Sequence, residues 1–130
     1  MPAEYIRLSQ QAKEQLVKLK RYTGIENWNV LCRWGFCLSL AEPTIPTDIK
    51  IPADSNVEMS WKVFGGKYHE LYSALLKERC LNDHLSIDEE TLSHQFRLHL
   101  HRGIAYLSGN PNIRSIQNFL SIAIPIDSEK

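Results

Sequence analysis

The apolar residues at the start of the chain change from an alternating to a helical spacing. Residues 5–9 (YIRLS) alternate polar and apolar positions as a half-buried β-strand does. From Ser9 onward the apolar residues recur every three or four positions, as far as Gly24, a residue type that commonly ends helices. The pattern predicts a short strand and then a helix with Ser9 as its N-cap. A strand this short needs a partner for its backbone hydrogen bonds.

The next segment predicts a more apolar helix and then an extended connector. Asn27 is a suitable N-cap, and the helix that follows it has few polar positions before Pro43 stops it. Apolar residues on most sides of a helix indicate burial on most sides, either by later segments or by another subunit. Residues 43–60 contain three prolines and scattered isoleucines, which indicates an extended connector with room for one edge strand.

Two further helices follow the connector. A third helix is expected from Trp61 to about Leu81, and a fourth from the capping sequence at Ser86 to Gly109. The third carries an apolar seam typical of helix pairing, and the glycine in the core stripe of the fourth suits a close helix crossing. The seam consists of Trp61, Phe64, Tyr68, Leu71 and Leu75, and the core stripe of Leu92, Phe96, Leu100, Gly103, Ile104 and Leu107.

A short strand, a basic helix and a second helix are the parts of a ribbon-helix-helix unit. In that architecture the strand pairs with the same strand of a second copy of the chain. Arg7 would then face outward together with Tyr5 and Ser9, on the side where such ribbons meet DNA, and the amide end at Asn27 could hold a phosphate. The helices after Trp61 could instead cover this unit or displace the strand pairing.

Composition and charge narrow the class of protein. The 130 residues, 43% hydrophobic and with zero net charge, indicate one ordinary globular domain. No apolar run is long enough for a membrane span, and the N-terminus lacks the order of a signal peptide, so a cytoplasmic protein without membrane contact is expected. The three cysteines fit reduced thiols in the core. The positive charge gathers in the first forty residues.

Two long stretches resemble the DndE family of bacterial DNA sulfur-modification (phosphorothioation) proteins. They are IRLSQQAKEQLVKLKRYTGIENWNVLCRWGFCLSL and WKVFGGKYHELYSALL, and the resemblance covers about residues 5–109. It implies a small, mainly helical protein that binds DNA, forms homo-oligomers and works beside the sulfur-transfer enzymes without catalysing the reaction. The DNA is expected to be double-stranded and could be nicked. With two unsatisfied apolar surfaces in the sequence, a homotetramer is the expected state.

The sequence FGGKY at residues 64–68 admits two interpretations. Gly65, Gly66 and Lys67 lack the other residues of a nucleotide-binding phosphate loop. The first interpretation is a local break or a close packing position in the third helix. The second, favoured by the resemblance, is a turn that offers amides and a lysine to DNA or to a neighbouring subunit.

The expected fold is mainly α, in a single domain spanning 1–130. It comprises a ribbon-helix-helix-like part (5–42), the connector (43–60), a helical extension (61–124) and a frayed tail (125–130). The histidines lack a ligand pattern, so neither a metal nor another cofactor is expected.

The expected function is backbone-directed DNA binding as a non-catalytic component of the sulfur-modification system. Two alternatives stay open beside it, namely a ribbon-helix-helix regulator and a sulfur-relay enzyme that uses a cysteine such as Cys32 next to Arg33. A purely structural adaptor would show no DNA affinity. The candidate DNA-binding residues are Arg7, Lys13, Lys18, Lys20, Arg21, Arg33 and Lys67, and the candidate turn or phosphate contacts are Gly65, Gly66 and Asn27.

Overall fold

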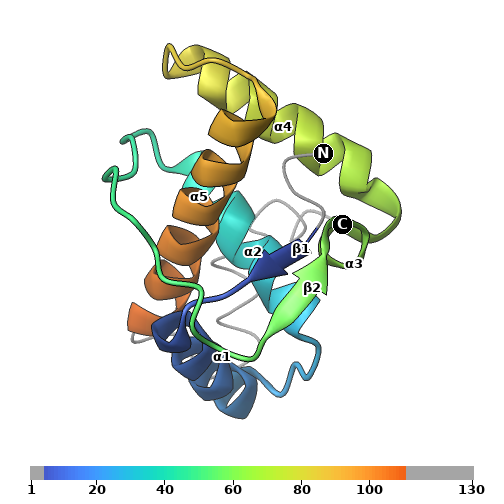
Figure 1. Cartoon of the computed structure of the whole chain (residues 1–130). Coiled ribbons are helices and arrows are strands. Elements are labelled where there is room, and N and C mark those ends of the chain that lie inside the picture. Colours follow the sequence, from blue (N-terminus) through green and yellow to red (C-terminus); the bar gives the residue numbers. More distant parts are fainter. Residues whose placement is uncertain (1–4, 111–130) are drawn as a thin grey trace, which may run out of the picture.

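A computed structural model describes residues 5–110, which form helices around one two-stranded sheet (Figure 1). The mainly helical fold with a short N-terminal strand confirms the expected class. The elements in chain order are β1 (Tyr5–Arg7), α1 (Gln10–Thr23), α2 (Trp28–Ala41), β2 (Glu58–Ser60), α3 (Trp61–Gly65), the 3-10 helix η1 (Gly66–Tyr68), α4 (His69–Asn82) and α5 (Glu89–Gly109). The sequence IRSIQNFLSIAIPI and the tail at 125–130 lie outside the described residues.

The bounds of α1 follow from its two caps. Ser9 Oγ accepts a hydrogen bond of 3.0 Å from the backbone N–H of Ala12, which satisfies one free donor of the first turn. Gly24 has φ 77°, a left-handed conformation that glycine adopts without steric cost, and its N–H bonds to Lys20 O. Both predicted ends of this helix are confirmed.

The strand β1 finds its partner within its own chain. It pairs antiparallel with β2, with Tyr5 opposite Ser60 and Arg7 opposite Glu58. The N–H of Leu8 continues the pairing to Val57 O at 3.0 Å. The expected pairing with a second copy is therefore wrong for this edge of the strand. The end of the connector supplies the missing backbone groups, and an intrachain partner avoids the entropy loss of association.

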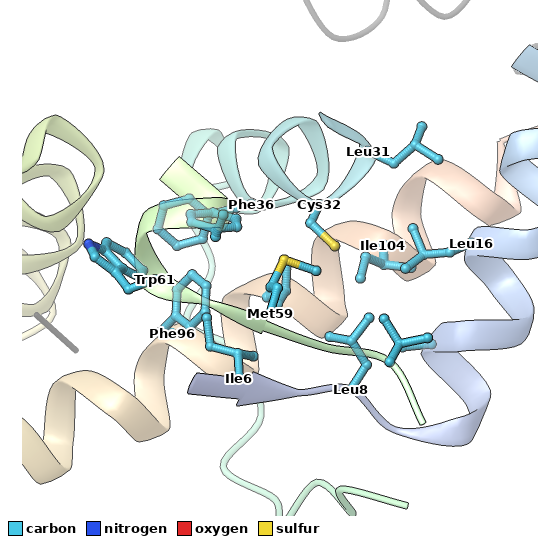
Figure 2. Packing of buried hydrophobic residues seen from close by; sticks show 14 of the residues in the cluster. Ile6, Leu8, Leu16, Leu31, Cys32, Phe36, Met59, Trp61, Phe96 and Ile104 are labelled. Atoms are coloured by element: carbon cyan, nitrogen blue, oxygen red, sulfur yellow. The ribbon is translucent and has the colours of Figure 1, made fainter. Parts of the chain in front are cut away.

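The centre of the molecule is a close crossing of α2 and α5. A Cβ on Gly103 would lie 1.6 Å from the carbonyl oxygen of Gly35, so only glycine permits this separation. Around the crossing, Ile6 of β1 and Met59 of β2 point into the same cluster as Phe36 and Phe96 (Figure 2). The close crossing expected from the glycine is confirmed, and all six residues of the predicted core stripe of α5 are buried.

The predicted third helix is broken at its two glycines. Gly66 has φ 61° and ψ −143°, a backbone conformation that side chains strongly disfavour, and η1 separates α3 from α4 there. The interruption shifts the phase of the helical repeat. Trp61 and Phe64 are buried as predicted, but Leu71 is 54% exposed, and Leu76 and Cys80 turn inward instead. The continuous apolar seam is therefore wrong beyond Phe64.

The connector before β2 is held by arginines rather than by regular structure. Arg97 donates to the carbonyls of Arg7 (2.7 Å) and Ile51 (3.2 Å). Arg102 donates to Thr44 O at 2.9 Å, and Arg79 donates to the same carbonyl at 2.7 Å. Irregular backbone needs such donors when it lies against a core.

The same arginines cover the C-terminal end of α2. Arg79 donates to Leu40 O at 2.9 Å and to Glu42 O at 2.8 Å, and Arg102 donates to Ser39 O at 2.9 Å. These carbonyls lie at the end of the helix and just beyond it, where carbonyls lack a full set of helical donors and positive charge is favourable, although Ser39 O also accepts from the N–H of Glu42 at 3.1 Å. Ser39, inside this end, is fully buried.

The start of α5 differs by two residues from the predicted cap. Asp88 is the N-cap, and its Oδ1 accepts from the N–H of Thr91 at 2.9 Å, whereas Ser86 lies outside the helix. These hydrogen bonds, with the side chains of Ser86 and Thr91, lower the pKa of Asp88 to about 2. A carboxylate is the stronger cap beside a helix N-terminus, which explains the shift.

Two histidines of α5 are neutral near pH 7, namely His99, which is buried, and His101, which is half-buried. His99 Nδ1 lies 2.9 Å from Ser39 Oγ, which also accepts a hydrogen bond from Arg102. His101 accepts from the N–H of Ser9 at 3.2 Å through Nε2 and lies 2.8 Å from Arg97 O through Nδ1. Burial lowers the pKa of each of these histidines to about 4.

We expect Gly103→Ala to destabilise the protein by at least about 2 kcal/mol, because the added methyl group overlaps the backbone of Gly35 and forces α2 and α5 apart. Urea unfolding followed by circular dichroism measures the change. Gly109→Ala is the matched control, since no heavy atom of residues 5–110 lies within 4 Å of a Cβ there. Equal stability of the two variants would contradict the crossing.

The free energy of unfolding should decrease as the pH falls from about 6.5 to about 4. In this range the unfolded chain binds protons at His99 and His101 that the folded chain excludes, so the slope approaches about 2 kcal/mol per pH unit. Urea titrations at several pH values measure it. His101→Gln should lower the slope by about half. A slope that His101→Gln does not alter would contradict this assignment.

Candidate nucleic-acid interface

The cations of α1 extend toward three different neighbours. Lys13 Nζ donates to Asn56 Oδ1 of the connector at 2.7 Å. Lys20 Nζ lies 3.9 Å from the ring centroid of Trp28, a cation–π contact with α2. On the other side, Lys18 Nζ donates to Ser108 O at 3.1 Å, near the end of α5. Each ammonium is positioned by a neutral partner and keeps its charge uncompensated.

The surface of α1 is therefore basic. Besides the three lysines it carries exposed Arg21, and its single carboxylate is Glu14. Between residues 5 and 110, side-chain ion pairs are formed by Arg7, Arg79 and His94, and none involves a cation of α1. An excess of unpaired positive charge on one helix is the usual electrostatic footprint of phosphate binding.

Arg7 is engaged within the chain. Its guanidinium lies 2.9 Å from Glu58 Oε1 and donates to Ser55 O at the same distance of 2.9 Å. Both contacts fix the side chain across the β1–β2 ladder. A guanidinium in this position has few donors left for base edges, which disfavours the ribbon type of DNA reading.

The second group of candidates lies at the glycine turn. Gly66 brings the chain close to Arg33 of α2, whose terminal guanidinium nitrogens are 3.9 Å from the position of a Cβ at residue 66. Arg33 Nε is buried and has no hydrogen-bond partner among residues 5–110. Lys67 follows in η1, with its Nζ 5.2 Å from the Tyr68 ring. The turn thus combines two cations from separate elements, Arg33 and Lys67.

Gly66 is required by its backbone conformation, and Gly65 by its close contact with the following helix. Gly66 has a positive φ, and a Cβ on Gly65 would lie 2.6 Å from the Cβ of His69. The interpretation of a local break is confirmed. Contact of the turn with phosphate stays a prediction.

The start of α2 is a poor place for a phosphate. The side chain of Asn27 makes no capping hydrogen bond. A pocket of about 220 Å³ beside it is lined by Asn27 and Asn29 but also by Glu26 and Glu58. The carboxylates of Glu26 and Glu58 in the lining oppose the attraction that free helix amides exert on an anion, with Glu58 partly compensated by its ion pair with Arg7.

The thiols are poorly suited to nucleophilic chemistry. Cys32 is fully buried, and burial raises its pKa to about 12 although Arg33 acts in the opposite direction. Burial also raises the pKa of Cys80 and of half-buried Cys37. A reactive cysteine needs an accessible thiolate, hence a lowered pKa.

The described residues hold no cluster suited to a metal ion. Within residues 5–110, no three side chains of the ligating types lie together. His94 lies 2.7 Å from Asp48 Oδ1, and His99 and His101 contact residues of the chain that are not metal ligands. No helix in this part of the chain is both long and apolar enough to cross a membrane.

Comparison with protein families gives the decisive observation. The model of the family described as "DNA sulphur modification protein DndE" matches residues 5–115. The chain belongs to the DndE family. The resemblance noted in the sequence, over about residues 5–109, is confirmed over its whole extent.

Solved structures agree with this membership. The crystal structure of DndE from Escherichia coli B7A, involved in DNA phosphorothioation modification, is similar with a TM-score of 0.70 and 25% identity, over 82% of this chain and 98% of that chain. A mutant DndE involved in DNA phosphorothioation matches with a TM-score of 0.63 and 24% identity, over 83% of this chain and 99% of that chain. A search of curated proteins gave no match.

Sequence reasoning missed some residues around the two basic groups of this DndE family member. Lys62, exposed in the short helix α3, lies close in sequence to Lys67 and was not among the predicted cations. The partners that position the lysines, such as Asn56 and Trp28, were not predicted either. The contact of Lys20 with Trp28 could have been predicted, because these residues lie on either side of Gly24, which ends the helix.

Alkylation of the native protein should leave Cys32 and Cys80 unmodified at neutral pH, because both thiols are buried and protonated. Mass spectrometry of peptides after treatment with iodoacetamide measures this, and the urea-unfolded chain is the control in which every thiol reacts. Rapid modification of Cys32 in the folded protein would reopen the possibility of a sulfur relay.

Proposed function

We propose that this DndE family member is a non-catalytic DNA-binding component of the DNA sulfur-modification system. It holds duplex DNA, including nicked duplex, through backbone phosphates. The observation that supports this proposal is the uncompensated positive charge of α1. Its lysines Lys13, Lys18 and Lys20 are each positioned by a neutral partner. Membership in a family of DNA sulfur-modification proteins indicates that the ligand of this surface is DNA, whose phosphates are negatively charged.

Contacts to phosphate rather than to bases fit this surface. Lysine ammonium groups neutralise phosphates from many directions, whereas base reading needs side chains fixed in a groove. The side chain best placed for base reading in a ribbon, Arg7, is paired with Glu58. A ribbon-helix-helix regulator is therefore the weaker alternative.

The sulfur-relay alternative finds little support in the thiols. A persulfide carrier must expose its sulfur to the donor and to the acceptor, and Cys32 and Cys80 are buried in the core. Cys37, half-buried on α2, has a pKa raised by burial, the opposite of an activated thiol. We assign the sulfur chemistry to the partner enzymes of the system.

A homotetramer fits the apolar surface of α4. Tyr68 and Leu71 are each 54% exposed and Leu75 is 38% exposed, at positions that follow one helix face. Exposed apolar stripes of this kind are typical of contacts between subunits. Assembly would also place several copies of the α1 surface on one particle. Each subunit then needs only a moderate affinity for the duplex.

The logarithm of the affinity for duplex DNA should fall linearly with the logarithm of the salt concentration. Each phosphate neutralised should contribute about 0.9 to the slope. Fluorescence anisotropy of a labelled duplex measures it. A duplex of scrambled sequence should bind with the same affinity, because the contacts are to the backbone. Affinity that does not depend on salt would contradict the proposal.

Single substitutions distinguish DNA binding through the lysines from DNA binding through a β-ribbon that contains Arg7. Lys13→Gln, Lys18→Gln, Lys20→Gln and Lys67→Gln should each weaken binding modestly and lower the salt slope by about one phosphate for each subunit in contact. Lys77→Gln on α4 is the matched control and should bind as the parent does. Loss of binding confined to Arg7→Gln, with all four lysine variants unaffected, would restore the ribbon arrangement.

Replacement of each cysteine by alanine tests the absence of catalysis. The three single variants should retain DNA phosphorothioation in cells, apart from losses that follow a measured decrease in stability at the buried positions. Iodine cleavage of genomic DNA reads the modification. Complete loss in a variant that folds as stably as the parent would contradict the non-catalytic role.

A further inference from the structure

The guanidinium of Arg33 on α2 has no partner in the part of the chain that the structure describes. Its Nε is buried without a hydrogen bond, and none of the ion pairs among residues 5–110 includes it. The side chain lies beside the glycine turn, with its terminal nitrogens 3.9 Å from the position of a Cβ at Gly66. A charge that is partly withdrawn from water is costly unless an acceptor pairs with it. Arg33 therefore lacks the carboxylate or other acceptor that its position requires.

Arg33 lies beside the beginning of the exposed apolar surface of α4. Burial raises the pKa of Tyr72 on α4, and the charge of Arg33 acts in the opposite direction, because the guanidinium is close to the phenol. Tyr72 follows Tyr68 by four residues and Leu71 by one, and both of these residues are exposed. The 3-10 helix that begins at Gly66 directly precedes α4. The unpaired guanidinium is therefore at the N-terminal end of this surface.

An unpaired carboxylate lies at the other end of the same surface. Leu71, Leu75 and Glu78 recur at spacings of four and three residues, so they share one face of α4. Glu78 is exposed, and within residues 5–110 it takes part in none of the ion pairs. Asp83, a few residues further along, is by contrast paired with Arg79 at 2.8 Å. This face of α4 thus has a free cation beside its beginning, apolar side chains in the middle and a free carboxylate near its end.

This arrangement of charges is complementary to itself. When two identical helices pack antiparallel about a twofold axis, each residue faces one that is equally far from the axis on the partner helix. For an axis at the level of Ser73, Leu71 faces the partner's Leu75, because both are two residues from the axis. Residues 68 and 78 are likewise equally far from it. Glu78 consequently reaches the glycine turn of the other copy, next to the partner's Arg33.

We propose that two copies of this chain pair through α4 in a twofold contact, in which Glu78 of each copy binds the partner's Arg33. The proposal rests on the homo-oligomer of the proposed function and names its contact, and two such dimers make up the tetramer. Aromatic residues and arginine are enriched at contacts between proteins, as they are at this surface. Arg33 is thereby assigned to a second copy rather than to a phosphate. Figure 1 shows α4 and α1 at opposite ends of the molecule, so the contact leaves the lysines of α1 open to DNA.

The mass of the assembled protein in solution tests this pairing. Glu78→Arg places like charges together at both ends of the contact, so the mass measured by light scattering should fall to half that of the parent. Glu70→Arg makes the same change of charge at an exposed site of α4, about 80° around the helix from Glu78, and should keep the mass of the parent. A monomeric parent, or Glu78→Arg at the mass of the parent, would overturn the proposal.

A mixture of two variants tests the twofold geometry. Arg33→Glu alone should also halve the mass. When Arg33→Glu and Glu78→Arg are mixed in equal amounts, opposite charges meet at both ends of a pair that contains one copy of each, so the mass of the parent should return. Circular dichroism shows whether each variant is folded, and if Arg33→Glu is not, the mass of Glu78→Arg decides alone. A mixture of folded variants that stays at half the mass would overturn the proposal.

These measurements are independent of DNA binding, because they are made without DNA and leave α1 unchanged. Duplex affinity of the parent that does not depend on salt would contradict the DNA-binding proposal and not this pairing. If Arg33 holds a DNA phosphate instead, Glu78→Arg keeps the mass of the parent, and Arg33→Gln lowers the salt slope by about one phosphate for each subunit in contact. That combination would overturn the pairing and leave the lysine surface of α1 in place.

Discussion

The fold depends on the absence of side chains at one point, where Gly35 of α2 meets Gly103 of α5. The backbones touch there, because a Cβ on Gly103 would lie 1.6 Å from Gly35 O. This separation lets Ser39 reach both His99 and Arg102 one turn further along. The same crossing fixes the rings of Phe36 and Phe96 with their centroids 5.2 Å apart at the centre of the core.

The positive side chains divide into two groups with different tasks. Arg79, Arg97 and Arg102 donate to carbonyls of the connector and of the end of α2, a use for which the planar guanidinium with its five donors is suited. The lysines of α1 remain at the surface with neutral partners. Zero net charge therefore coexists with a local basic surface, because the carboxylates lie mostly elsewhere.

Local patterns predicted the elements whose determinants are local. Ser9 and Gly24 fixed both ends of α1, and the 3.6-residue period fixed the core stripe of α5. The partner of β1 could not be predicted in this way, since β2 has only three residues at the end of an irregular connector. The seam of the third helix failed because a positive φ at Gly66 changes the helix phase, which the spacing of apolar residues does not reveal.

For the candidate site, the sequence predicts which charged residues take part, whereas their contacts depend on the fold. The lysines of α1 were predicted from charge, but the pairing of Arg7 with Glu58 depends on the β1–β2 register and could not be read from either segment. The approach of Arg33 to Gly66 likewise joins residues from separate helices.

Protection of lysines by bound DNA tests the central claim most directly. Acetylation of the protein with and without duplex, quantified by mass spectrometry for each lysine, reports which ammonium groups contact phosphate. The account predicts protection of Lys13, Lys18, Lys20 and Lys67, with Lys50 and Lys77 labelled equally in both states. Protection confined to Lys50 and Lys77, or equal labelling of every lysine with the duplex bound, would contradict it.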